Sequence, residues 1–159
     1  MTRRTVDGVR FDPYAADRDA YGHVFGLARH LARSRLDPGT RSLVELRASQ
    51  VNGCAFCLEL HAKAARRADV AQEKLDLLAG WREAPCFSPK EQAALALCEE
   101  MVRIGDGARV AEQTWARVRS EFDDDEIASL LYTVALIAFW NTLNVAVEFP
   151  SGAELPQLP

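Results

Sequence analysis

Two thiols and one imidazole lie between positions 54 and 61, at a spacing that would let them act together in one reaction. Cys54 and Cys57 are separated by two residues, and His61 follows four residues after Cys57. On an α-helix, offsets of three, four and seven residues put all three side chains on one face. Such a face can form a disulfide, react with an oxidant or supply part of a metal shell.

The start of a helix favours the thiol chemistry. Unpaired backbone N–H groups and the helix dipole stabilise negative charge there and so lower the pKa of a thiol. Because Cys54 and Cys57 are three residues apart, an oxidised sulfur on one can be resolved by the other into a disulfide. His61 lies one turn after Cys57 and can accept the thiol proton or donate one to a leaving oxygen. The two thiols and the imidazole are therefore the groups that a dithiol redox centre needs.

Two other interpretations of these residues remain open. Both cysteines could be buried small residues and His61 a packing residue, although a CxxC pair in an intracellular chain is a recognised redox signature. A metal site is the second interpretation, because the three side chains could each be a ligand. No second CxxC or HxxxH pair completes a zinc shell, however, so we expect no metal. Cys86 and Cys98 are isolated, and we interpret them as structural.

Length and composition indicate one acidic domain. A chain of 159 residues with 48% apolar residues can bury a core, and a net charge of -4 argues against a nucleic-acid partner. Residues 1–10 contain no apolar run typical of a secretory signal, and four cysteines without an export signal favour a reducing compartment. We therefore expect a cytoplasmic protein with a single domain, a core at about residues 10–148 and a flexible tail at 149–159.

Hydrophobic periodicity predicts helices throughout the chain, and no segment alternates as a strand would. The turn signal Asn52-Gly53 separates two helices, and Asn52 is an acceptable N-cap for the helix that carries the cysteines. Ser88 and Glu91 form a capping box with proline at the first helical position. The predicted helices cover residues 14–35, 38–51, 54–68, 71–82, 90–104, 110–122 and 127–147.

The last predicted helix is apolar enough to raise the question of a membrane. Residues 127–147 are long enough to span a bilayer. However, Asn141, Asn144 and several hydroxyl residues interrupt the run, and an acidic cluster at 123–126 directly precedes it. These features favour a helix buried on most sides, in the core or between subunits, over a membrane span.

The segment that carries the cysteines resembles a known family. Its sequence from Leu46 to His61, LRASQVNGCAFCLELH, closely resembles the core motif of the AhpD-like, carboxymuconolactone decarboxylase superfamily. Residues 81–85 (WREAP), 88–97 and 140–144 (WNTLN) are similar to the peroxidase-related branch of that superfamily. The resemblance covers about residues 10–148, and the CxxCxxxH core after Asn-Gly is its specific part.

The resemblance implies an all-α fold, an AhpD-like bundle of about six to seven helices that forms a homo-oligomer, commonly a trimer or hexamer. It also implies a hydroperoxide or disulfide reductase without a cofactor, in which Cys57 attacks the peroxide, Cys54 resolves it and His61 serves a proton relay. An external dithiol would be the reductant. The helix dipole alone favours Cys54 as the nucleophile, whereas the adjacent His61 favours the assignment that the family implies.

The chain departs from the family pattern at several positions. Ser42 replaces the relay glutamate that members usually carry twelve residues before the first cysteine. Glu45, one turn further along the same face, is the candidate to replace it through a water, or else it is a surface acid. Phe56 replaces a histidine of some peroxidase members, and Thr142 stands where similar chains have arginine. We expect these departures to lower the peroxidase rate.

Three functions follow from these observations. The leading one is a thiol-dependent hydroperoxide reductase that uses the CxxC pair. The second is a decarboxylase or a related lactone enzyme, as the other name of the superfamily implies, although such members do not need the CxxC pair. The third is a non-catalytic redox sensor whose disulfide changes its oligomer.

Overall fold

A computed structural model describes residues 8–155, and within this range the chain is all-α with no strand. The all-α prediction is therefore confirmed. Eight α-helices are found in the described range, one more than the sequence predicts. Their bounds are α1 Pro13–Ala16, α2 Arg18–Leu31, α3 Pro38–Asn52, α4 Ala55–Arg67, α5 Gln72–Leu77, α6 Pro89–Val102, α7 Glu112–Glu121 and α8 Asp124–Ala146, with short 3-10 turns η1 Leu78–Gly80 and η2 Ile104–Asp106.

The additional helix arises because the first predicted helix is divided in two. The Asp12 carboxylate accepts hydrogen bonds from the backbone N–H groups of Tyr14 and Ala15 and so caps α1. The Asp17 carboxylate accepts one from the N–H of Ala20 and caps α2. A side chain that satisfies a new helix start stabilises a break in the chain at that point.

The predicted cap of the cysteine-bearing helix is wrong. Asn52 is the last residue of α3, and Gly53 closes that helix in the left-handed region at a φ of 68°. Cys54 is the N-cap of α4, and its sulfur accepts the N–H of Cys57 at 3.3 Å. The reason is that Gly53 completes the C-terminus of α3 first, so the new helix begins at the first cysteine.

Two capping boxes start the helices of the second half. In the first, Ser88 and Glu91 exchange side-chain and backbone hydrogen bonds at the start of α6, as predicted. In the second, Asp123 and Glu126 do the same at the start of α8, within the predicted acidic cluster. Each box satisfies N–H groups that the helix itself leaves unpaired.

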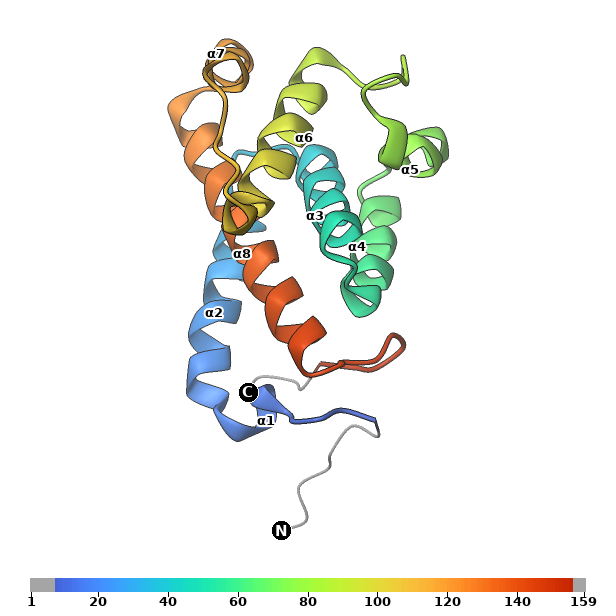
Figure 1. Cartoon of the computed structure of the whole chain (residues 1–159), viewed down its shortest axis with the longest axis vertical. Helices are drawn as coiled ribbons and strands as arrows, with labels where there is room; N and C mark the ends of the chain where they lie inside the picture. Colours follow the sequence, from blue (N-terminus) through green and yellow to red (C-terminus); the bar gives the residue numbers. More distant parts are fainter. Residues whose placement is uncertain (1–7, 156–159) are drawn as a thin grey trace.

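The helices α3 and α8 pack together at the centre of the bundle. Helix α3 contacts α4, α6 and α8, and α8 also contacts α2, α4 and α6. Figure 1 shows α2 beside the middle and lower part of α8, with α3 and α4 on its other side. This arrangement brings the start of α4, the middle of α3 and the C-terminal half of α8 together.

Within the single chain, helix α8 is buried on one side, so the core alone does not supply the burial on most sides that the sequence predicts in the core or between subunits. Its inward residues include Leu130, Ile137 and Asn144, whereas Tyr132 and Phe139 are 59% and 44% exposed on the outer side. By length and composition alone the helix could cross a membrane. The buried asparagines and the capped acidic start explain why it packs as part of the bundle.

The segment after α8 folds back along α4, although the sequence predicts that a flexible tail begins at residue 149. Phe149 is buried, and its ring packs edge-on against the ring of Phe56 at 4.9 Å. The backbone N–H of Gly152 donates to the carboxylate of Glu59 at 2.6 Å. Burial of the large aromatic ring of Phe149 stabilises the packing of this segment against α4. The part of the predicted tail at 156–159 lies outside the described residues.

Candidate active site

The two predicted cysteines form a disulfide at the start of α4. The Cα atoms of Cys54 and Cys57 lie 5.3 Å apart, and each residue is 2% exposed. Cys54 caps the helix and Cys57 lies in its first turn, so the local start of α4 brings the sulfurs together. The pair therefore has the geometry that the CxxC spacing predicts.

One of the two cysteines faces a cavity. A pocket of about 130 Å³ lies between α2, α4 and α8, and Cys57 lines it whereas Cys54 does not. Its wall is mostly apolar, and its polar side chains come from α1, α3, α4 and α8. The apolar lining residues are Phe25, Ala28, Phe56, Leu60, Leu136, Ile137, Trp140 and Leu155, and the polar ones are Tyr14, Glu45, His61 and Asn144.

Two of the predicted site residues meet inside this pocket. The Nδ1 atom of His61 lies 3.2 Å from Oε2 of Glu45, with side chains 14% and 22% exposed. The two atoms are close enough for an ion pair when His61 is protonated. They are not aligned as a hydrogen bond, so the buried Nδ1 atom has no hydrogen-bond partner among residues 8–155. Ser42 is buried and does not line the pocket.

Sequence reasoning missed two residues of the site. The side-chain Nδ2 of Asn144 donates to the sulfur of Cys57 at 3.4 Å, and the hydroxyl of Tyr14 donates to Oδ1 of Asn144 at 2.5 Å. Burial raises the pKa of Tyr14 well above its usual range, so this hydroxyl stays protonated. Asn144 was visible in the sequence as a polar interruption of an apolar helix, but nothing in the sequence indicates a role for Tyr14.

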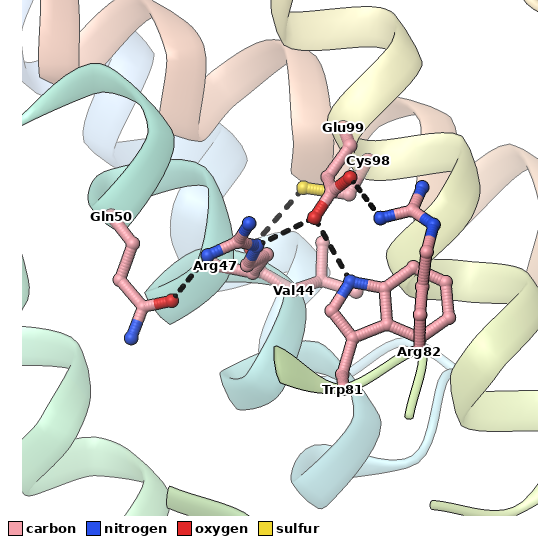
Figure 2. Close-up of polar contacts among 7 residues, drawn as sticks. All are labelled: Val44, Arg47, Gln50, Trp81, Arg82, Cys98 and Glu99. Carbon is pink, nitrogen blue, oxygen red and sulfur yellow. Dashed lines mark hydrogen bonds and ion pairs between the residues drawn. The ribbon is translucent and has the colours of Figure 1, made fainter. Parts of the chain in front are cut away.

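A second buried polar cluster lies apart from the sulfur site and holds α3, α6 and the segment after η1 together (Figure 2). Glu99 is 3% exposed and accepts hydrogen bonds from Arg47 at 2.7 Å and Trp81 at 2.9 Å. Arg82 adds a third bond at 2.5 Å. Burial alone would raise the pKa of Glu99, but the bonds from Trp81, Arg82 and Arg47 outweigh it and lower that pKa. The cluster fixes the bundle around a charged carboxylate.

The two remaining cysteines lie outside the pocket. Cys98 is fully buried and donates its S–H to the carbonyl of Val44 at 3.4 Å. Burial raises the pKa of Cys98 to about 12, so the thiol stays protonated near neutral pH, in keeping with a structural role. Cys86 is free and partly exposed. In the part of the chain that the structure describes, no group of three or more His, Cys, Asp or Glu side chains is arranged to hold a metal ion.

Comparison of sequences relates the chain to other proteins. The model of the carboxymuconolactone decarboxylase family matches residues 18–100. The uncharacterised protein YdfG of Bacillus subtilis is 32% identical over 121 residues, which cover 76% of this chain and 82% of YdfG. The uncharacterised protein YnjA of Escherichia coli is 30% identical over 124 residues, which cover 78% of this chain and 64% of YnjA.

Solved structures share the same helical arrangement. An Agrobacterium tumefaciens protein of unknown function, proposed to be the antioxidant defence protein AhpD, is 27% identical with a TM-score of 0.84. The match covers 92% of this chain and 99% of that one. A peroxidase-related protein from Ralstonia eutropha, described as an alkylhydroperoxidase AhpD core, is 19% identical with a TM-score of 0.75 over 89% of this chain and 75% of its own. At that identity the second likeness concerns the fold alone.

Proposed function

Because the chain belongs to the carboxymuconolactone decarboxylase family and has an AhpD-like fold, we propose that it is a thiol-dependent hydroperoxide reductase. The observation that supports this most is the position of the Cys57 sulfur. It is bonded to Cys54 and borders a cavity that His61 and Glu45 also line. A nucleophile, a resolving thiol and a proton carrier are the groups that such a reaction requires.

The proposed reaction begins with the reduced pair. The Cys57 thiol gives its proton to His61, and the thiolate attacks the terminal oxygen of a hydroperoxide. A sulfur–oxygen bond forms and the oxygen–oxygen bond breaks, which leaves a sulfenic acid on Cys57 and an alkoxide that takes the proton from His61. The Cys54 thiol then attacks the oxidised sulfur, and the disulfide forms as water leaves. An external dithiol reduces this disulfide and is itself oxidised to a disulfide.

The position of each cysteine relative to the cavity supports these roles. Cys57 lines the cavity and Cys54 does not, so an entering peroxide meets Cys57 first. Glu45 is 3.2 Å from His61, so its carboxylate can hold the imidazole in place at the cavity. We therefore propose that Glu45 takes the place of the glutamate that Ser42 replaces.

The experiment follows each cysteine separately. The reduced wild-type protein, Cys54→Ser and Cys57→Ser each receive one equivalent of cumene hydroperoxide and are analysed by mass spectrometry with dimedone as a sulfenic-acid trap. We expect a Cys54–Cys57 disulfide in the wild type, a trapped sulfenic acid on Cys57 in Cys54→Ser, and no oxidation of the site in Cys57→Ser. Cys86→Ser is the matched control and should behave as the wild type.

Turnover distinguishes the proposal from the other two functions. With dithiothreitol as the reductant, the wild type should consume many equivalents of peroxide, and Cys54→Ser/Cys57→Ser should consume none above background. Oxidation of the pair without turnover would indicate a redox sensor instead. Peroxide consumption that persists in the double variant would contradict the proposal, and activity on a lactone substrate in that variant would favour a decarboxylase.

We propose further that the protein forms a homo-oligomer and acts in the cytoplasm. The outer side of α8 supports an oligomer, because Tyr132 and Phe139, seven residues apart on the same side of this helix, are both exposed and an exposed apolar surface often marks a protein interface. The need for a dithiol reductant supports a reducing compartment.

A further inference from the structure

We propose that Asn144, held by Tyr14, is a positioning residue that fixes the Cys57 sulfur and stabilises its thiolate. The effect of Asn144 on catalysis rests on the proposed function, whereas its effect on the Cys57 thiol does not. Three elements distant in sequence supply the parts. Asn144 is 87 residues from Cys57, and Tyr14 is 130 residues from Asn144.

The two sulfurs have different hydrogen-bond donors. The Cys54 sulfur accepts the backbone N–H of Cys57 at 3.3 Å, because an N-cap side chain lies over the unpaired N–H groups of the first turn. The Cys57 sulfur lies one turn further in and accepts the Nδ2 of Asn144 at 3.4 Å. The backbone therefore supports a thiolate at Cys54, and a side chain from α8 does so at Cys57. This donor offsets the advantage that the helix start gives to Cys54.

The orientation of the Asn144 amide follows from chemistry. A sulfur in a disulfide or a thiolate carries no proton, so it can accept a hydrogen bond only from the NH₂ group of the amide. The amide oxygen then faces Tyr14, whose hydroxyl donates to it at 2.5 Å. Burial raises the pKa of Tyr14, so the hydroxyl remains a donor over the pH range in which the thiol titrates.

The surroundings of these groups make the bond effective. Tyr14, Asn144 and Cys57 are 1%, 3% and 2% exposed, so water competes little for the same atoms. The Tyr14 ring is held by aromatic neighbours, with ring centroids 5.0 Å from Tyr21 and 5.4 Å from Phe149. Because these contacts hold the Tyr14 ring in place, its hydroxyl is held too, and the hydroxyl in turn orients the Asn144 amide.

The test measures the thiol directly in the reduced full-length protein. The rate of Cys57 alkylation by iodoacetamide is followed against pH, and tandem mass spectrometry separates Cys57 from Cys54. In Asn144→Leu, which keeps a similar volume but donates no hydrogen bond, we expect the midpoint of the Cys57 profile to rise by about one pH unit. In Tyr14→Phe the amide loses its anchor, so a smaller rise is expected.

Asn141→Leu is the matched control. Asn141 is buried on the same helix, and its Oδ1 lies 3.2 Å from the hydroxyl of Ser49. No hydrogen bond from it to either cysteine is found among residues 8–155. This variant should therefore leave the Cys57 midpoint unchanged even if it loses stability.

The outcomes separate this inference from the proposed function. An unchanged Cys57 midpoint in Asn144→Leu overturns the inference, and so does an equal rise in Asn141→Leu. If Asn144→Leu does not fold, Tyr14→Phe decides, because it removes one oxygen and keeps the ring packing. Alkylation consumes no peroxide, so an absence of peroxide turnover would overturn the proposed function and leave this measurement intact.

Discussion

His61 and Glu45 meet at the cavity that Cys57 also lines, and in the proposed reaction they form the proton relay. The two side chains come from α4 and α3, and Nδ1 of His61 lies 3.2 Å from Oε2 of Glu45. In the sequence, His61 follows Cys57 by four residues and Glu45 follows Ser42 by three, and in the structure both His61 and Glu45 line the cavity. Whether Glu45 reached the site depended on how closely α3 and α4 pack.

The first prediction concerns this pair. Replacement His61→Gln should lower peroxide turnover by about a hundredfold, because a general acid–base contributes at least that much. Replacement Glu45→Gln should lower it by about tenfold, since the imidazole remains but its charge partner is lost. Steady-state peroxide consumption with dithiothreitol measures both. The exposed acid Glu73 on α5 offers the control Glu73→Gln, and a Glu45→Gln rate equal to that control would contradict the prediction.

The second prediction concerns the buried carboxylate of Glu99. Replacement Glu99→Gln should reduce the free energy of unfolding at pH 7 by about 3 kcal/mol, because it leaves Arg47 and Arg82 without their anionic partner. The pKa of Glu99 is lowered in the folded protein, so its stabilisation is complete above the unfolded pKa of about 4.3 and is lost as the pH falls through the folded value.

Denaturant unfolding at several pH values measures this effect. The difference between the wild type and Glu99→Gln should be constant near neutrality and should shrink below pH of about 4. Glu83→Gln, which alters an exposed acid near the same segment, is the control and should change stability little. A difference that grows on acidification would contradict the assignment of Glu99 as a charged group.

At the scale of the elements, the junction between α3 and α4 positions the redox pair. Gly53 adopts a φ of 68°, which L-residues with a side chain rarely adopt. A Cβ there would meet no heavy atom within 4 Å, so only the backbone conformation opposes a larger residue.

The capping signals at Ser88 and Asp123 were recognisable in the sequence because they operate within one turn. The break at Asp17 obeys the same rule but lies inside the range 14–35 that the sequence predicts as one helix.

The third prediction tests this junction. Replacement Gly53→Ala should reduce the free energy of unfolding by about 1 kcal/mol, which is the cost of a left-handed conformation for alanine. Gly26→Ala is the matched control. Gly26 lies inside α2 with equally open space around its Cα, so this change should stabilise the protein by about 0.5 kcal/mol. Denaturant unfolding of both variants measures the contrast, and effects of the same sign would contradict it.

At the scale of the whole molecule, the outer side of α8 is an apolar surface that the single chain leaves uncovered. The sequence predicted that this helix is buried on most sides, yet Tyr132 and Phe139 are 59% and 44% exposed. The prediction allowed for burial in the core or between subunits, and the core of one chain covers only one side of the helix. A second copy of the chain would bury this side as well.

The fourth prediction therefore concerns assembly. The wild type should elute as a trimer or hexamer in size-exclusion chromatography with light scattering, and Phe139→Glu should shift it to a smaller species, because a charge there would be buried without a partner. Leu77→Glu is the control, since Leu77 is similarly exposed at 41% but lies on α5. A monomeric wild type would contradict the prediction.

The sequence by itself determined the all-α fold, the CxxC pair at a helix start and the family, because periodicity, caps and the motif depend on residues within a turn or two of one another. Only the tertiary structure decided that Asn144 and Tyr14 meet Cys57 and that Glu45, not Ser42, reaches the cavity. Those contacts join segments far apart in the chain, and their existence depends on how side chains fill the space between packed helices. No pattern of residues within a turn or two of the chain predicts that packing.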